Sequence, residues 1–116
     1  IPVLEQGINL HGASAIIEKD LAAGLLAEEL NADTLLILTS VENVSLNLGK
    51  ADEQKLGSIS AADAKKYIEE DQFASGSMLP KIEAGISFIE KGRAAVITDM
   101  AHAKEGYEEK AGTIIR

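Results

Sequence analysis

Thr34-Leu35-Leu36-Ile37-Leu38-Thr39 is a continuous apolar run, as expected of a strand buried on both faces of a sheet. A helix is predicted before it, opened by Asp20 and ended by Asn31-Ala32-Asp33. Its leucines recur on one side at helical spacing: Leu21, Leu25, Leu26 and Leu30. The short apolar segment Ala15–Ile17 predicts another strand ahead of the helix. Strand, helix and buried strand form a βαβ unit, which indicates an α/β protein with a parallel sheet.

The rest of the chain alternates in the same way between helical and strand patterns. Ser60 and Asp63 resemble a capping box, and isoleucines at helical spacing follow Met78. The further elements expected are a hairpin of Ile1–Leu4 and Asn9–His11 around Glu5-Gln6-Gly7, a short strand near Val44–Leu46, helices over Ala61–Glu70, Met78–Lys91 (ended by Gly92) and Ala101–Glu105, and strands over Ala94–Thr98 and Thr113–Ile115.

Composition excludes several classes of protein. The chain has 116 residues, 46% hydrophobic and 26% charged, which suits one globular domain. A net charge of −8 argues against non-specific nucleic-acid binding, and the absence of cysteine excludes disulfides and thiolate metal sites. No apolar run approaches membrane-spanning length and no signal-peptide pattern is present, so we expect a cytoplasmic protein. Ile1-Pro2-Val3 lacks an initiator methionine, so we also expect a piece of a longer polypeptide.

Gly76-Ser77-Met78-Leu79-Pro80-Lys81 is a small-residue loop that runs directly into a helix. Backbone N–H groups in a first helical turn lack intrahelical partners, and the helix dipole adds positive charge there. Lys81 in that turn makes the loop a candidate phosphate site. The alternative is an ordinary helix, with Ser77 as N-cap, Pro80 in the first turn and Lys81 solvated.

Two further segments are candidates for the same site. Lys19-Asp20 follows a predicted strand, and open α/β sheets bind ligands at the carboxyl ends of their strands. A lysine there would neutralise phosphate and an aspartate would hold lysines in position; alternatively, Asp20 only caps its helix. Thr39-Ser40-Val41 lies just beyond the buried strand and is a weak signal by itself.

Other common sites have no support in the sequence. There is neither a P-loop motif nor a glycine-rich dinucleotide fingerprint. His11 and His102 are isolated and lack a plausible cluster for metal or triad chemistry.

Several segments together resemble the C-terminal half of the carbamate kinases, which are members of the amino acid kinase family. The resemblance covers essentially the whole chain, and its G-S-M-x-P-K-[IV]-E-A segment is specific within the family. It rests on Ile17-Glu18-Lys19-Asp20-Leu21-Ala22, Leu36-Ile37-Leu38-Thr39-Ser40-Val41-Glu42-Asn43-Val44, Leu46-Asn47-Leu48-Gly49-Lys50, Lys65-Lys66-Tyr67-Ile68-Glu69-Glu70, Phe73-Ala74-Ser75-Gly76-Ser77-Met78-Leu79-Pro80-Lys81-Ile82-Glu83-Ala84 and Ala111-Gly112-Thr113-Ile114-Ile115.

This resemblance implies a three-layer αβα sandwich with a mainly parallel sheet, and reversible phosphoryl transfer between ATP and carbamate. It implies that Lys19 contacts phosphates, that Asp20 organises the catalytic lysines and that Lys81 stabilises the transferring phosphoryl group. Mg²⁺ is expected with the nucleotide phosphates, with few protein ligands. The residues implied to bind ATP or ADP are Lys19, Thr39, Ser40, Val41, Val44, Gly76, Ser77, Met78, Pro80 and Lys81.

The resemblance also implies what lies outside residues 1–116. The family's N-terminal half carries the glycine-rich loops that bind carbamate or carbamoyl phosphate, and the full-length proteins form homodimers and serve arginine fermentation. We therefore expect these residues alone to be inactive, with no nucleic-acid or membrane partner. Two alternatives stay open: another amino acid kinase with a different acceptor, or a non-catalytic truncated module.

Overall fold

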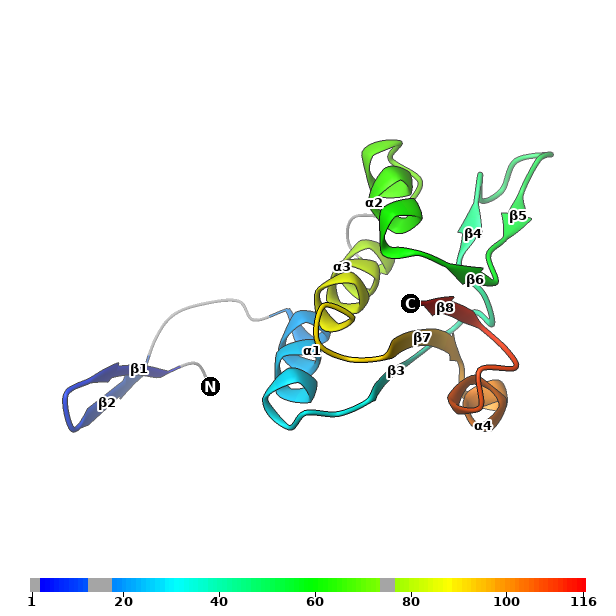
Figure 1. Ribbon diagram of the computed structural model, residues 1–116. Coiled ribbons are helices and arrows are strands. Elements are labelled where there is room, and N and C mark those ends of the chain that lie inside the picture. Colours follow the sequence, from blue (N-terminus) through cyan, green and yellow to red (C-terminus); the bar gives the residue numbers. More distant parts are fainter. Residues whose placement is uncertain (1–2, 13–17, 74–76) are drawn as a thin grey trace.

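The computed structural model describes residues 3–12, 18–73 and 77–116 (Figure 1). Its main sheet has the strand order β3-β7-β8-β6. The elements are β1 (Val3–Gln6), β2 (Asn9–Gly12), α1 (Lys19–Glu29), β3 (Thr34–Thr39), β4 (Ser45–Leu46), β5 (Gln54–Lys55), β6 (Ser58–Ile59), α2 (Ala61–Glu69), α3 (Met78–Phe88), β7 (Ala94–Asp99), the 3₁₀ helix η1 (Met100–His102), α4 (Ala103–Tyr107) and β8 (Thr113–Ile115).

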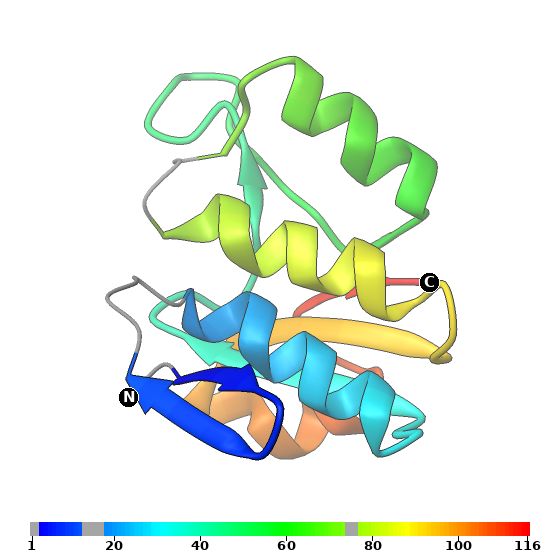
Figure 2. The ribbon, with the colours of Figure 1, turned by 90° about the vertical axis from the view of Figure 1, so that its left-hand side faces the viewer.

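The main sheet lies between two layers of helices, as the αβα prediction requires. Helices α1 and α3 pack on one face of β3 and β7, while α4 packs on the other (Figure 1). Figure 2 shows α1 and α3 side by side along their length. They approach closely at Gly24, where an added Cβ would meet the Ala84 Cβ at 3.5 Å. Two of the three strand pairings in this sheet are parallel, so the predicted fold class is confirmed.

The core lies between the sheet and the α1–α3 layer. Strand β7 occupies the middle of the sheet and its residues 94–98 are buried. The largest fully buried side chains belong mostly to α3, β7 and β8: Phe88, Ile82, Ile97, Ile115, Val44, Val96, Thr98 and Thr113. Strands β3 and β7 pair in parallel around this core, so both strands end at the same edge of the sheet.

Two burial expectations were wrong. Strand β3 is not buried on both faces: Leu35 and Ile37 are buried, but Leu38 is 42% exposed. Strand β3 ends the described sheet, and the face that carries Leu36 and Leu38 packs against α4, a helix of only five residues. The leucines of α1 do not form its packed side either, because Asp20 and Gly24 are its buried residues. Leu21, Leu25, Leu26 and Leu30 are all exposed.

Most of the other expected elements are present, with shifted ends. The hairpin β1–β2 forms, and α2 begins with Ser60 accepting a hydrogen bond from the Asp63 backbone N–H at 3.1 Å. Helix α3 ends at Phe88, before the predicted end at Lys91. Strands β5 and β6 were not predicted, since two-residue strands carry no periodic signal. The predicted strand Ala15–Ile17 lies outside the described residues. Across the described part of the chain, no helix is both long and apolar enough to cross a bilayer.

Thr98 offers a test of this packing. Its Oγ1 is buried and makes no hydrogen bond to any residue that the structure describes. Thr98→Val keeps the shape and removes an unsatisfied hydroxyl, so we expect unfolding stability to stay unchanged or rise by about 1 kcal/mol. Chemical denaturation measures this. The control is Thr113→Val, which removes an equally buried hydroxyl that makes two hydrogen bonds and should cost about 1–3 kcal/mol. A loss of stability in Thr98→Val equal to that of the control would contradict the prediction.

Candidate functional site

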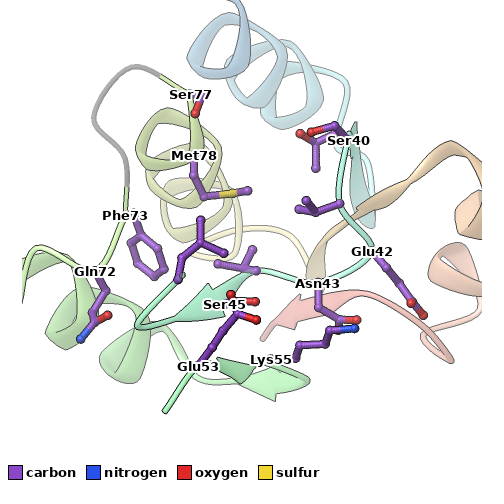
Figure 3. Close-up of a pocket in the computed structure, with 14 residues that line it drawn as sticks. Ser40, Glu42, Asn43, Ser45, Glu53, Lys55, Gln72, Phe73, Ser77 and Met78 are labelled. Carbon is purple, nitrogen blue, oxygen red and sulfur yellow. The ribbon is translucent and has the colours of Figure 1, made fainter. Parts of the chain in front are cut away.

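The carboxyl ends of β3 and β7 define the edge of the sheet at which the candidate site lies. The two strands run parallel and in register, with Thr39 opposite Asp99 at their ends. The chain leaves β3 there and lines a cavity of about 480 Å³. The residues around the cavity, drawn in Figure 3, are Thr39, Ser40, Val41, Glu42, Asn43, Val44, Ser45, Leu48, Glu53, Lys55, Gln72, Phe73, Ser77 and Met78.

The cavity has two walls that are far apart in the sequence. One wall is the segment 39–45, and the other comes from residues around Phe73 and from the beginning of α3. Figure 3 shows Phe73 and Met78 on the side opposite Ser40 and Asn43. A lining that combines apolar side chains with hydroxyl, amide and charged groups suits a small molecule that has both an apolar face and polar edges.

Buried hydrogen bonds hold the wall that follows β3. The Val44 backbone N–H donates to Thr113 Oγ1 at 2.8 Å, and that hydroxyl donates to the Leu56 carbonyl oxygen at 2.7 Å. The same carbonyl accepts a hydrogen bond from Asn43 Nδ2 at 2.8 Å. Thr113 belongs to β8, so the last strand of the chain fixes the position of the cavity wall.

A buried ion pair lies beside the cavity, between α1 and α3. Lys81 Nζ donates to Asp20 Oδ2 at 3.0 Å and to the Ser77 carbonyl oxygen at 3.3 Å. Lys81 and Asp20 are each only 7% exposed. Ser77 also lines the cavity, so the ammonium group lies one hydrogen bond from the cavity wall. The alternative reading of Lys81 as a solvated lysine is therefore wrong.

Lys19 brings a second positive charge to this pair. Its Nζ lies 4.0 Å from Asp20 Oδ2, and its side chain is 81% exposed. The N-cap of α1 is Glu18, whose carboxylate accepts the Asp20 backbone N–H at 3.3 Å. Asp20 therefore does not act as the cap, and its side chain is free to join two lysines that are 62 positions apart in the printed sequence. The Lys19 ammonium also lies 3.9 Å from Glu18 Oε1, but because its side chain is 81% exposed it stays accessible to an anion.

The structure brings together most of the residues that the sequence singled out. Six of them line the cavity: Thr39, Ser40, Val41, Val44, Ser77 and Met78. Lys19, Asp20 and Lys81 form the adjacent charged cluster, and Pro80 lies in the first turn of α3 without lining the cavity. Gly76 lies outside the described residues. Ser77 precedes α3 as expected but makes no side-chain cap hydrogen bond.

The sequence had not named the other lining residues among its nucleotide-binding residues: Glu42, Asn43, Ser45, Leu48, Glu53, Lys55, Gln72 and Phe73. Glu42, Asn43 and Phe73 lie in segments that carry the family resemblance, but no periodicity marks their side chains as cavity-lining.

His102 is not isolated, which corrects the sequence-based interpretation. Its Nδ1 lies 2.6 Å from Asp99 Oδ1, and its Nε2 lies 3.7 Å from Glu42 Oε1. The hydrogen bond to Asp99 is the main reason that the pKa of His102 is raised above 6.5. The same bond holds the pKa of Asp99 below 3.8. Within the described ranges, no three His, Asp or Glu side chains converge as metal ligands.

Comparison with known proteins shows which family and which solved structure this chain is similar to. A model of the amino acid kinase family matches residues 1–99. The carbamate kinase-like protein YqeA of Escherichia coli K12 is 54% identical over 117 residues, and the carbamate kinase of Clostridium perfringens is 48% identical over 117 residues. Each alignment covers 99% of this chain, which spans only 38% and 37% of those proteins. The solved structure of Giardia lamblia carbamate kinase bound to AMP-PNP is 40% identical with a TM-score of 0.93, covering 99% of this chain and 41% of that one.

Proposed function

Because this chain belongs to the amino acid kinase family, we propose that it carries the nucleotide site of a carbamate kinase. The proposed reaction is reversible phosphoryl transfer from carbamoyl phosphate to ADP, which forms ATP and carbamate. The observation that carries the proposal is the buried Lys81–Asp20 pair, with Lys19 beside it, next to the 480 Å³ cavity. A similar protein was solved with the nucleotide analogue AMP-PNP, which supports a nucleotide as the ligand.

The cavity would hold the nucleoside part of ATP or ADP. Val44, Phe73 and Met78 offer apolar surface for a base, while Thr39 and Ser40 offer hydroxyls at the strand end. The wall of the cavity is pre-formed by the Thr113 and Asn43 hydrogen bonds. A pre-formed wall favours binding because little order has to be gained when the ligand arrives.

The lysine cluster would hold the phosphates. Phosphoryl transfer needs little covalent chemistry from the protein, so positioning and neutralisation of charge supply most of the acceleration. Asp20 Oδ2 holds the Lys81 ammonium group at 3.0 Å. The positive charge would therefore already be in place beside the phosphates, and it would not have to reorganise during the reaction. Lys19, being exposed, would meet the phosphates of the arriving nucleotide. We expect Mg²⁺ to be held mainly by those phosphates, where it neutralises charge, since the Asp20 carboxylate is already paired.

The acceptor side of the reaction would lie elsewhere. We propose that contacts to carbamate belong to the part of the relatives' length that this chain does not span, so that residues 1–116 alone are inactive. By the same resemblance, we propose a cytoplasmic homodimer that works toward ATP in arginine breakdown. Another amino acid kinase would share the nucleotide site and differ in the acceptor, and a non-catalytic module would bind no nucleotide.

Calorimetry with Mg-ADP tests the nucleotide site directly. We expect binding to the folded protein, and a weaker affinity in Lys19→Ala by about two- to fivefold, as for one exposed charge pair. Because Lys19 is 81% exposed, its removal should leave the unfolding transition unchanged. The matched control is Lys91→Ala, an exposed lysine just beyond α3, which should bind like the wild type. Undetectable binding at millimolar Mg-ADP in a folded sample would favour the non-catalytic alternative.

A further inference from the structure

His102 joins two segments that leave the sheet at the same edge. It lies in η1, directly after β7, and its backbone N–H donates to Asp99 Oδ1 at 3.0 Å. Its ring Nδ1 meets the same oxygen at 2.6 Å, so Asp99 fixes both the backbone and the ring. The opposite ring nitrogen, Nε2, faces Glu42 on the segment after β3.

Glu42 belongs to the wall of the proposed nucleotide cavity. It lines that cavity between Val41 and Asn43, but Figure 3 shows its side chain directed away from Phe73 and Met78. Its carboxylate is therefore available on the outer side of the wall, where His102 Nε2 lies 3.7 Å away. Hydrogen bonds hold Asn43 and Val44, as described above, whereas among the described residues the ionic partner of Glu42 is His102.

We infer that His102 is a positioning residue for the nucleotide cavity. Its protonated ring bridges Asp99 and Glu42 and so holds the cavity wall from outside; we call this bridge the brace. The inference rests on the proposed function, because it concerns the same cavity. In the protonated ring, Nδ1–H donates to Asp99 and Nε2–H attracts Glu42. In the neutral ring, the short contact to Asp99 keeps the proton on Nδ1, and the Nε2 lone pair then faces a carboxylate. Deprotonation therefore loosens Glu42 while leaving Asp99 bound.

The direction of the pH dependence follows from the groups around the ring. The hydrogen bond to Asp99 raises the pKa of His102 above 6.5, and the charges of Asp99, Glu42 and Glu105 raise it further, while burial opposes them. The brace is thus complete below about pH 6.5 and is lost as the pH rises through the raised value. Asp99 does not limit it on the acid side of this range, because its own pKa lies below 3.8.

Two variants separate charge from shape: His102→Gln, which never carries the charge, and His102→Lys, which carries it throughout. We propose Mg-ADP titrations at about pH 5.5 and about pH 8.5. The wild type should bind like His102→Lys at the acid end and like His102→Gln at the alkaline end. The expected difference between the variants is about two- to fivefold in dissociation constant, as for one partly exposed ion pair. At each pH, the dissociation constant of a variant is divided by that of the wild type, which cancels the effect of protonation of the nucleotide itself.

The other histidine of the chain provides the control. His11 lies exposed in β2, and His11→Gln should follow the wild type at both pH values. A wild-type pH response that persists unchanged in His102→Gln would overturn the inference while leaving the proposed function intact. Absence of Mg-ADP binding at every pH would overturn both.

An NMR titration of the His102 ring tests the brace without nucleotide. Removing the Glu42 charge in Glu42→Gln should lower the pKa of His102, because that charge contributes to raising it. An unchanged His102 titration in Glu42→Gln would contradict the bridge.

Discussion

Lys81→Ala is expected to lower kcat of the proposed full-length carbamate kinase by about 100- to 1,000-fold, the usual cost of removing one preorganised charge from a transition state. Lys81 is 7% exposed and its ammonium group donates to both Asp20 and the Ser77 carbonyl oxygen, so the charge that is removed is one held in a fixed, buried position. Affinity for ADP should change less than kcat, because the group is proposed to act on the transferring phosphoryl group. Steady-state kinetics in the ATP-forming direction measures both.

The result has to be separated from a loss of folding, since Lys81→Ala leaves the buried Asp20 carboxylate unpaired. Circular dichroism on the same samples reports folding. Lys81→Met, which fills more of the vacated volume, provides a second variant with the same lost charge. Lys91→Ala, an exposed lysine beyond α3, is the control with normal kinetics. A folded Lys81 variant with near-normal kcat would contradict the catalytic assignment.

Asp20→Ala is expected to destabilise the protein by about 3–5 kcal/mol, the cost of leaving one member of a buried pair uncompensated. Asp20 accepts a hydrogen bond from Lys81 Nζ at 3.0 Å between α1 and α3, and the side chains of Lys81 and Asp20 are only 9% and 10% exposed. Removal of the carboxylate leaves the Lys81 ammonium group unpaired between packed helices. Urea denaturation followed by circular dichroism measures the loss.

A double variant decides whether the cost comes from the unpaired charge. In Asp20→Ala combined with Lys81→Met, neither charge remains, so stability should recover by a large part of the loss. Glu83→Ala, an exposed acidic residue on α3, should change stability by less than about 0.5 kcal/mol. If the double variant were as unstable as the sum of its single changes, the pair would not be the source of the effect.

The candidate site was only partly predictable. Lys81 and Ser77 lie in a loop-to-helix motif that local physics connects with anions, and Lys19-Asp20 lies at the beginning of a helix. These signals do not depend on the rest of the chain. Gln72 and Phe73, in contrast, line the cavity only because the segment after α2 folds back beside the segment after β3. Phe73 belongs to a segment that carries the family resemblance, but no periodicity marks either side chain as part of a cavity wall.

His102 shows the same limit more sharply. In the sequence it stands three residues from Asp99 and 60 positions from Glu42, and nothing links it to either. The parallel, in-register pairing of β3 and β7 brings the ends of both strands to one edge. That pairing is what places the segment carrying Glu42 beside the ring of His102.

The amino-acid sequence by itself determined the α/β class, the position of α1, α3, β3 and β7, and the candidate lysines, because apolar periodicity and helix-start chemistry act over a few residues. Only the tertiary structure decided which faces are buried. The leucines of α1 are exposed while Asp20 is buried, because α1 meets α3 through Gly24 and Ala84. The Lys81–Asp20 pair joins residues 61 positions apart. Such a contact depends on how helices pack on the sheet, and that is a property of the whole chain.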